Sequence, residues 1–261
     1  MIKPYSHCKY FLLFVFLLTA FTEGVKAKKP MQPGLCLTFD DRNMLHWEKQ
    51  IPLFAKYNAH VTFFVDRFDM LTPEQIRALE ELRKAGHTIG CHGLRHLNAA
   101  EYSKKNTPGK YIREEILPAI KIMEENGFHP SFFAYPGSNN DELTDKALRK
   151  YFRHLRTGCR VSESMESTNC AFVKMKDVGK KGVFYGLSFH PKSRNDELVI
   201  QAKKAIDRIT ENKEMLVLYA HDLVNAGEVS TSHYITADAL EEILAYAEKK
   251  QIRLYSFDEL P

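Results

Sequence analysis

Apolar and polar residues alternate in blocks along the chain from residue 34 to the C-terminus. Short, almost continuously apolar runs such as His60–Val65 are rich in β-branched and aromatic residues and predict buried strands. The amphipathic segments between them predict helices. We therefore expect strands over 34–39, 60–65, 87–91, 131–135, 154–157, 171–175, 183–189, 215–220 and 252–257, and helices over 45–57, 72–86, 111–126, 141–152, 196–212 and 237–250.

The segment after the second predicted strand carries the clearest helix boundaries. Thr72 can cap a helix, Pro73 suits its first turn, and Gln75 completes a capping box. Gly86 then ends the helix. Repeated strand–helix units with apolar strands indicate a parallel sheet covered by helices. We predict a single α/β domain with about seven parallel strands, arranged as a closed or incomplete (β/α) barrel.

Polar motifs follow the carboxyl ends of four predicted strands. In barrels and in open parallel sheets, functional sites gather at this edge. The placement therefore indicates that the motifs share one site. They are Asp40-Asp41, His92–His96, Pro136-Gly137 and His221-Asp222.

The first two motifs have the composition of a divalent-metal hydrolase site. Two imidazoles and one carboxylate can hold a metal with positions left open, and a second carboxylate can act as general base. Adjacent strand residues point to opposite faces, so Asp40 and Asp41 can take different roles. The spacing of His92 and His96 places both rings on one side of a helical turn. The alternative is an ordinary acidic turn beside two structural histidines.

Other polar residues at the strand ends are ambiguous by themselves. His221 can serve as a general acid near neutral pH, or it can be a capping or core histidine. Tyr135, Pro136 and Gly137 can form a loop near the substrate, or only a turn. Trp47, the only tryptophan, can line a sugar site or pack in the core. Two further histidines lack a partner in the sequence: His190 and His233.

The N-terminus predicts export. A basic start, the apolar run Phe11–Leu18 and the small-residue exit Val25-Lys26-Ala27 are typical of a secretory signal peptide over residues 1–27. The run is shorter than the ~20 residues that cross a bilayer, so a membrane span is the alternative only with tilt or thinning. We expect residues 28–261 to form the catalytic domain, periplasmic or extracellular, without stable membrane association after cleavage.

Charge and cysteines restrict the picture further. A formal net charge of +4 is too balanced to indicate a nucleic-acid partner. Cys159 and Cys170 flank a polar loop and either pair or stay free, because spacing alone does not fix connectivity. Cys36 and Cys91 lie inside predicted strands, and we interpret them as small buried apolar residues.

The order of the motifs resembles the polysaccharide deacetylase family, also called the NodB-homology domain. The motifs are TFDD at 38–41, HxxxH at 92–96, a Pro-Gly loop at 136–137 and a strand that ends at His221. The resemblance covers residues 34–261, nearly the whole predicted domain. It implies a distorted (β/α) barrel, in agreement with the strand–helix pattern.

The resemblance also implies a role for each motif residue in removing N-acetyl groups from a carbohydrate. Asp40 matches the catalytic base and His221 the catalytic acid, and backbone N–H groups near Tyr135 would hold the oxyanion. The substrate would be an acetylated carbohydrate, and acetate would be released. The metal ligands would be Asp41, His92 and His96, with zinc or another divalent ion.

Three positions depart from the family pattern. Gly93 stands where the second motif usually has Ser or Thr, which predicts a looser loop. Ala134 stands where the third motif often has the Arg that orients the catalytic Asp, so this orientation must come from elsewhere. The Asp and Trp of the fourth motif have no counterpart between residues 150 and 190. These departures bear on substrate preference and rate more than on metal binding.

Three alternatives to N-acetyl hydrolysis stay open from the sequence. An O-acetyl polysaccharide esterase can use the same site. A non-catalytic carbohydrate-binding domain can keep the fold without turnover. An Fe(II) oxygenase shares the two-His, one-carboxylate set, but the neighbouring Asp40 and the parallel-strand pattern disfavour it.

Overall fold

The computed structural model describes residues 31–261 except 162, 191–194, 229 and 231–232. The predicted signal peptide, residues 1–27, lies outside this part. Within it, no helix has both the length and the apolar character that a bilayer crossing requires.

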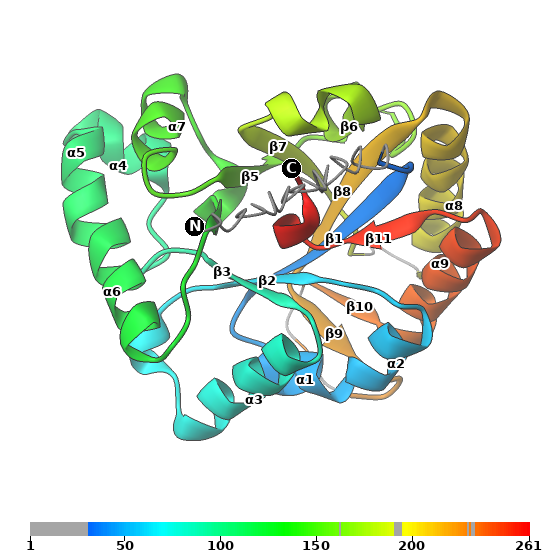
Figure 1. The fold of residues 1–261 in the computed structure, drawn as a ribbon, viewed down its shortest axis with the longest axis horizontal. Coiled ribbons are helices and arrows are strands. Elements are labelled where there is room, and N and C mark those ends of the chain that lie inside the picture. Colours follow the sequence, from blue (N-terminus) through cyan, green and yellow to red (C-terminus); the bar gives the residue numbers. More distant parts are fainter. Residues whose placement is uncertain (1–30, 162, 191–194, 229, 231–232) are drawn as a thin grey trace, which may run out of the picture. The chain divides into compact units, whose positions relative to one another are not determined.

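Seven parallel strands form a closed barrel (Figure 1), which confirms the predicted fold class. The strands follow one another in the order β1-β2-β3-β4-β5-β7-β8, and pairing between β1 and β8 closes the ring. Their carboxyl ends therefore meet at one edge. The strands are β1 Gly34–Asp41, β2 Thr62–Val65, β3 Thr88–Cys91, β4 Phe132–Ala134, β5 His154–Cys159, β7 Val183–Ser188 and β8 Glu214–Ala220.

Short additional strands distort the barrel. β11, Arg253–Tyr255, pairs with the first half of β1, whereas β2 pairs with the second half. β6, Phe172–Lys174, runs antiparallel to β8. A separate parallel pair, β9 Asp222–Val224 and β10 Tyr234–Thr236, was not predicted, because three-residue strands are too short to show a pattern.

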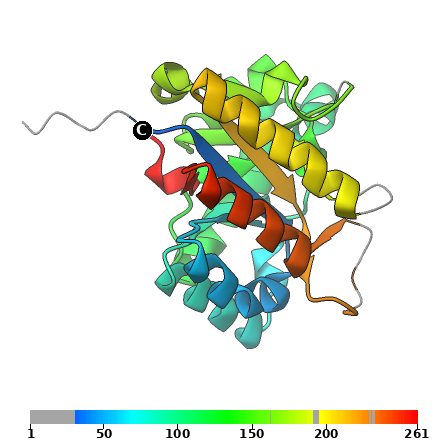
Figure 2. The ribbon, with the colours of Figure 1, turned by 90° about the vertical axis from the view of Figure 1, so that its right-hand side faces the viewer.

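Helices cover the outside of the barrel, and Figure 2 shows α8 and α9 side by side there. The capping box at Thr72 is confirmed: its Oγ1 accepts from the Gln75 N–H at 3.3 Å, and Gln75 Oε1 accepts from the Thr72 N–H at 2.9 Å. The helices are α1 Met44–Lys49, α2 Ile51–Lys56, α3 Pro73–Lys84, α4 Ala99–Lys105, α5 Pro108–Tyr111, α6 Leu117–Glu125, α7 Glu142–Leu148, α8 Asn195–Asn212 and α9 Ala237–Lys249, with a π-helical turn at Ile112–Ile116 and 3₁₀ turns at Phe68–Met70, Pro136–Ser138, Asn169–Ala171, Met175–Lys180 and Phe257–Glu259.

Two predicted helices are divided in the structure. The helix expected over 45–57 is α1 followed by α2, with Gln50 between them and Pro52 near the start of α2. The helix expected over 111–126 continues from α5 through the π-helical turn Ile112–Ile116 into α6. Each hydrogen bond of a π turn spans one residue more than in an α-helix, and the apolar periodicity of the sequence did not reveal this turn.

Alternation along β1 separates two apolar clusters. Leu35, Leu37 and Phe39 pack in the main core, which includes the helices, whereas Cys36 belongs to a second cluster formed mainly by barrel strands. By the two-residue period, Asp40 lies on the same face as Cys36. The first acid of the pair therefore points into the barrel at the end of the strand.

The cysteines and the tryptophan have structural positions. Cys159 and Cys170 form a disulfide with a Cα–Cα distance of 6.3 Å. Cys36 and Cys91 are buried free thiols, as expected, and burial raises the pKa of Cys91 to about 12. Trp47 is fully buried and stacks on Phe63 at 4.9 Å between ring centroids, so it is a core residue and not a sugar platform.

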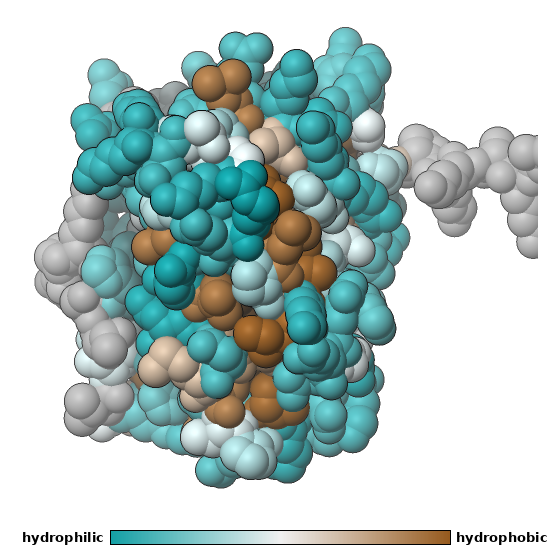
Figure 3. All heavy atoms as spheres, turned by 90° about the vertical axis from the view of Figure 1, so that its left-hand side faces the viewer, coloured by the Kyte–Doolittle hydropathy of each residue, from teal (hydrophilic) through white to brown (hydrophobic). Residues whose placement is uncertain are grey.

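One outer face carries an apolar band. Figure 3 shows the side of the molecule with α4, α5 and α6, where apolar side chains lie among hydrophilic ones. Leu117, in α6, has 40% of its surface exposed.

Candidate active site

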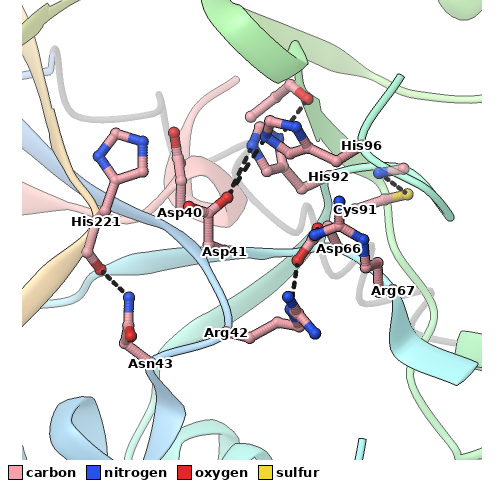
Figure 4. Close-up of polar contacts among 12 residues, drawn as sticks. Asp40, Asp41, Arg42, Asn43, Asp66, Arg67, Cys91, His92, His96 and His221 are labelled. Carbon is pink, nitrogen blue, oxygen red and sulfur yellow. Dashed lines mark hydrogen bonds and ion pairs between the residues drawn. The ribbon is translucent and has the colours of Figure 1, made fainter. Parts of the chain in front are cut away.

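Asp41, His92 and His96 come together at the carboxyl ends of β1 and β3 (Figure 4). Asp41 Oδ1 lies 3.6 Å from His92 Nε2 and 3.5 Å from His96 Nε2. One ligand atom from each residue can be chosen so that all lie within 4.8 Å of one another. The ring planes of the two histidines are tilted by 77°, so their nitrogens approach a common point from different directions.

The orientation of His92 is set by the neighbouring strand. Its Nδ1 lies 2.8 Å from the carbonyl oxygen of Ala134 and donates to it, which leaves the Nε2 lone pair directed at Asp41. Burial lowers the pKa of His92 to about 3, with the nearby Asp41 opposing this shift. The imidazole is therefore neutral near pH 7, the form that binds a metal.

These three residues fit a divalent cation. Asp41 Oδ1 is buried and has no hydrogen-bond partner among the described residues, although it faces both imidazole nitrogens. A buried carboxylate oxygen without a donor is unfavourable unless a cation or water satisfies it. Oxygen and imidazole ligands suit zinc and other divalent transition metals. The predicted ligands are thus brought together.

Asp40 is the buried member of the acidic pair. Arg156, at the middle of β5, donates from Nη2 to Asp40 Oδ2, and both side chains are buried. Asp40 Oδ1 has no hydrogen-bond partner within the described part of the chain. One oxygen is therefore fixed by a cation while the other is available to accept a proton.

Arg156 was missed in the sequence, although it gives Asp40 the hydrogen bond that the family's arginine was expected to give. In the β4–β5 register it is paired with Ala134, the residue that replaces the family's arginine. Its guanidinium packs over the rings of Phe64 at 5.4 Å and Tyr219 at 4.7 Å. The available signal was an arginine inside a predicted strand, which the structure shows to be mostly buried as His154–Cys159.

His221 follows β8, whose register aligns Ala220 with Phe39 of β1. The residues that come next on these two strands, His221 and Asp40, therefore reach the same edge, and Figure 4 shows them beside each other. The His221 carbonyl accepts hydrogen bonds from Trp47 Nε1 at 2.9 Å and Asn43 Nδ2 at 3.4 Å. These contacts fix the backbone, whereas the ring nitrogen Nδ1 has no partner among described residues.

Two histidines that lacked a partner in the sequence surround His221 in the structure. The ring centroids lie 5.5 Å apart for His190–His221, 5.2 Å for His221–His233 and 4.8 Å for His190–His233. Burial lowers the pKa of His190 to about 4, with further lowering by the two neighbouring rings. His190 is therefore neutral near pH 7 and adds no charge beside His221.

The Pro-Gly loop gives a mixed result. Tyr135 is fully buried, its Oη donates to Asp145 Oδ1 at 2.6 Å, and its backbone N–H donates to the Arg156 carbonyl at 2.8 Å. Neither its hydroxyl nor its N–H is free for substrate, because both are used inside the protein. Pro136 and Gly137 lie at the end of β4 with Gly137 exposed, and their contact with substrate stays a prediction.

The loop that carries His96 is held from α5–α6. The buried Glu115 carboxylate accepts from the backbone N–H groups of Arg95 at 2.8 Å and Leu97 at 3.1 Å. A carboxylate therefore supplies support that a hydroxyl was expected to give. The looser loop expected from Gly93 stays a prediction.

The fold and these residues define a class: a closed (β/α) barrel with an Asp–His–His set and a second Asp at the carboxyl edge. Residues 27–153 match the model of the polysaccharide deacetylase family. This part of the chain belongs to the family.

Two curated proteins are related at the sequence level. A peptidoglycan-N-acetylglucosamine deacetylase of Bacillus cereus is 26% identical over 117 residues, 44% of this chain and 52% of that protein. A chitin deacetylase of Arthroderma benhamiae is 25% identical over 122 residues, 46% of this chain and 32% of that protein. The chain thus spans about half or less of the length of these relatives.

Solved structures share the fold at low identity. The chitin deacetylase of Colletotrichum lindemuthianum aligns with a TM-score of 0.58 and 14% identity, over 88% of this chain and 87% of that one. A family 4 acetyl xylan esterase of Clostridium thermocellum, in complex with cobalt, gives 0.57 and 17% over 86% and 88%. A family pseudoenzyme from Bacillus anthracis gives 0.55 and 13% over 88% and 66%.

Proposed function

We propose that this protein is a metal-dependent hydrolase that removes N-acetyl groups from a carbohydrate polymer or oligosaccharide and releases acetate. The observation that carries the proposal is that Asp40, buried and paired with Arg156, lies beside the Asp41–His92–His96 set. A structural cation site would not need a second carboxylate with one free oxygen next to it. Membership of the deacetylase family supports the same activity.

The residues divide the work of amide hydrolysis between them. As water adds to the acetyl carbonyl carbon, its proton passes to the free Oδ1 of Asp40, while Arg156 keeps the other oxygen in place. When the carbon–nitrogen bond breaks, His221 gives a proton to the departing nitrogen. The products are acetate and a free amine on the sugar.

The proposed cofactor is a divalent ion, with zinc as the first candidate. Asp41, His92 and His96 would hold it, and the hydrogen bond from His92 Nδ1 to the Ala134 carbonyl fixes one ligand ring. A bound ion would supply Lewis-acid chemistry, which polarises a carbonyl and lowers the pKa of water. The oxygen and nitrogen donors do not by themselves distinguish zinc from cobalt.

O-acetyl ester hydrolysis is the second candidate. The observation that favours it is structural: an acetyl xylan esterase and a chitin deacetylase resemble the fold of this chain about equally well. An ester leaving group departs as an alcohol, so it needs less help from His221 than an amine does. A non-catalytic carbohydrate-binding protein is the remaining candidate, because a pseudoenzyme also shares the fold.

One experiment separates these candidates. The purified protein is analysed for bound metal, reloaded with Zn²⁺, and assayed for acetate release from chitooligosaccharide, peptidoglycan and acetylated xylan. We expect release from an N-acetylated substrate. Release from acetylated xylan alone would support the esterase. A metal-loaded protein that binds these carbohydrates and releases no acetate would contradict the enzymatic proposal.

We also propose that the protein is exported, with cleavage after Ala27. The support is the basic and apolar pattern of residues 1–27. Expression of the full chain, followed by cell fractionation and N-terminal sequencing, should find a periplasmic or extracellular form that begins at Lys28. A cell-associated form that keeps Met1 would contradict cleavage.

A further inference from the structure

We propose that Glu115 is a positioning residue for the metal site, which it serves by fixing the loop Gly93–Leu97 that carries His96. This inference rests on the proposed function. Glu115 is fully buried, and within the described part of the chain its carboxylate accepts hydrogen bonds from Arg95 and Leu97 and from none of the three ligand side chains. It would act through the backbone of the loop.

The Glu115 carboxylate holds the loop on both sides of the ligand. Oε1 accepts from the N–H of Arg95 at 2.8 Å and from the N–H of Leu97 at 3.1 Å, the residues directly before and after His96. Oε2 accepts from the Arg95 side-chain Nε at 3.3 Å. The two backbone donors flank His96 and point at one oxygen, so the peptide groups around the ligand cannot rotate without losing a bond.

The backbone at His96 needs such support. Its φ of +60° is in the left-handed region, which a non-glycine residue occupies at a conformational cost. Strained residues of this kind persist where surrounding contacts hold them, and they occur often at functional sites. Without the Glu115 contacts, the loop would relax and His96 Nε2 would leave its position 3.5 Å from Asp41 Oδ1.

Gly93 makes room for the carboxylate. A Cβ at this position would lie 2.6 Å from Glu115 Oε1, and the Gly93 φ of +90° disfavours any side chain. The glycine and the buried acid are therefore one arrangement: the space beside His92 is occupied by Glu115 and not by a side chain from the loop itself. This accounts for Gly93, which looked like a loss of support in the sequence.

A π-helical turn places Glu115 in this position. The turn Ile112–Ile116 joins α5 to α6, and within it Glu115 is buried whereas the adjacent Glu114 faces solvent. Such turns shift the side-chain directions of a helix by adding a residue, and they are frequent at functional sites. Two neighbouring glutamates thus have different roles, and one provides a matched control.

The test is the affinity for Zn²⁺, measured by competition with a chromophoric chelator, in variants of the full chain. Glu115→Ala should bind Zn²⁺ about 10–100-fold more weakly, the usual effect of removing a residue that orients a metal ligand. Glu115→Gln keeps the carbonyl oxygen that accepts both N–H groups, so it should remain within about threefold of the wild type. Glu114→Ala should bind Zn²⁺ like the wild type.

A variant at another buried acid, Glu214, distinguishes a general loss of stability from a specific loss of Zn²⁺ affinity. Glu214, at the opposite end of the barrel, pairs with Arg208 at 3.0 Å and Lys174 at 3.2 Å. Glu214→Ala should lower the melting temperature of the metal-free protein and leave Zn²⁺ affinity unchanged. Gly93→Ala places a Cβ against Glu115 Oε1 and so disturbs the same contact while Glu115 itself is kept. This variant should also bind Zn²⁺ more weakly, and it tests the proposal if Glu115→Ala does not fold.

Zn²⁺ affinity of Glu115→Ala within twofold of the wild type would overturn the proposal, as would an equal loss of affinity in Glu214→Ala. Acetate release does not enter this measurement. A wild-type protein that binds Zn²⁺ and hydrolyses no acetylated sugar would contradict the proposed function, while the affinity difference would still support the role of Glu115.

Discussion

The two halves of the candidate site are held in different ways. In the metal half, His92 is oriented by a backbone carbonyl, and the His96 loop by a buried acid that contacts peptide N–H groups. In the proton-transfer half, Asp40 is held by one buried guanidinium from β5. The metal half therefore depends on several hydrogen bonds to backbone groups. The proton-transfer half depends on a single ion pair inside the barrel.

This difference has an energetic consequence. A typical hydrogen bond contributes about 1 kcal/mol, so the metal half should weaken in steps as contacts are removed. Removing one member of a buried ion pair leaves a charge without a partner and costs about 3–5 kcal/mol. The proton-transfer half should therefore fail abruptly, in stability and activity together.

The largest expected effect is in the proton-transfer half. Asp40→Asn removes the proposed base and should lower kcat/KM by about 10²–10⁴-fold, the usual contribution of general-base catalysis. Its Zn²⁺ affinity should match the wild type, because the ligands are untouched. Steady-state acetate release and chelator competition measure the two quantities. A variant with full activity would refute the assignment of Asp40.

Arg156→Met should show the abrupt failure. It leaves the Asp40 carboxylate buried without its cation, so the free energy of unfolding should fall by about 3–5 kcal/mol in urea titrations. Adding Asp40→Asn in the same chain removes the unpaired charge and should recover part of the loss. If the double variant is less stable than Arg156→Met, the ion pair is not the origin of the effect.

The buried histidines His87 and His92 lie at opposite ends of β3, and the pH dependence of stability tests the one that is outside the site. Burial, with the charge of His60, lowers the pKa of His87 to about 4 from its usual 6.5. The unfolded chain therefore binds a proton first as the pH falls, and stability present above pH 6.5 is lost toward pH 4. His87→Gln should remove this loss, which amounts to about 3 kcal/mol.

Urea titrations between pH 7 and pH 4 measure the His87 effect. Zn²⁺ should stabilise the wild type and His87→Gln equally at pH 7, because His87 lies at the end of β3 away from His92. Equal acid sensitivity of the two proteins would show that His87 does not titrate as a buried group.

The smallest effect is expected at Tyr135. Tyr135→Phe removes the hydrogen bond to Asp145, which keeps its contacts with Asn140, so stability should fall by about 1 kcal/mol. KM for an acetylated substrate should not change, because the hydroxyl points into the protein. A severalfold rise in KM would instead support the predicted substrate-binding role of Tyr135.

Most strands and helices could be predicted because apolar blocks correspond directly to buried strands. The capping box at Thr72 was exact for a similar reason: its contacts are three residues apart. The pair β9–β10 and the π-helical turn were not predicted, since neither leaves a periodic signal of sufficient length.

The candidate site divides in the same way. Local motifs indicated Asp40, Asp41, His92 and His96, because metal ligands and a base need particular residue types at close spacing. Arg156, Glu115 and the histidines around His221 gave little signal, since each reaches the site from another strand, helix or loop.

The sequence by itself therefore determined the barrel and the identity of the chemical groups, because both follow from local patterns of apolar and ligand residues. Only the tertiary structure decided what holds those groups. In the sequence, Gly93 and Ala134 indicated the loss of a supporting hydroxyl and of an orienting arginine. In three dimensions Glu115 and Arg156 occupy the space beside them, because close packing at a barrel end brings together residues that the chain separates.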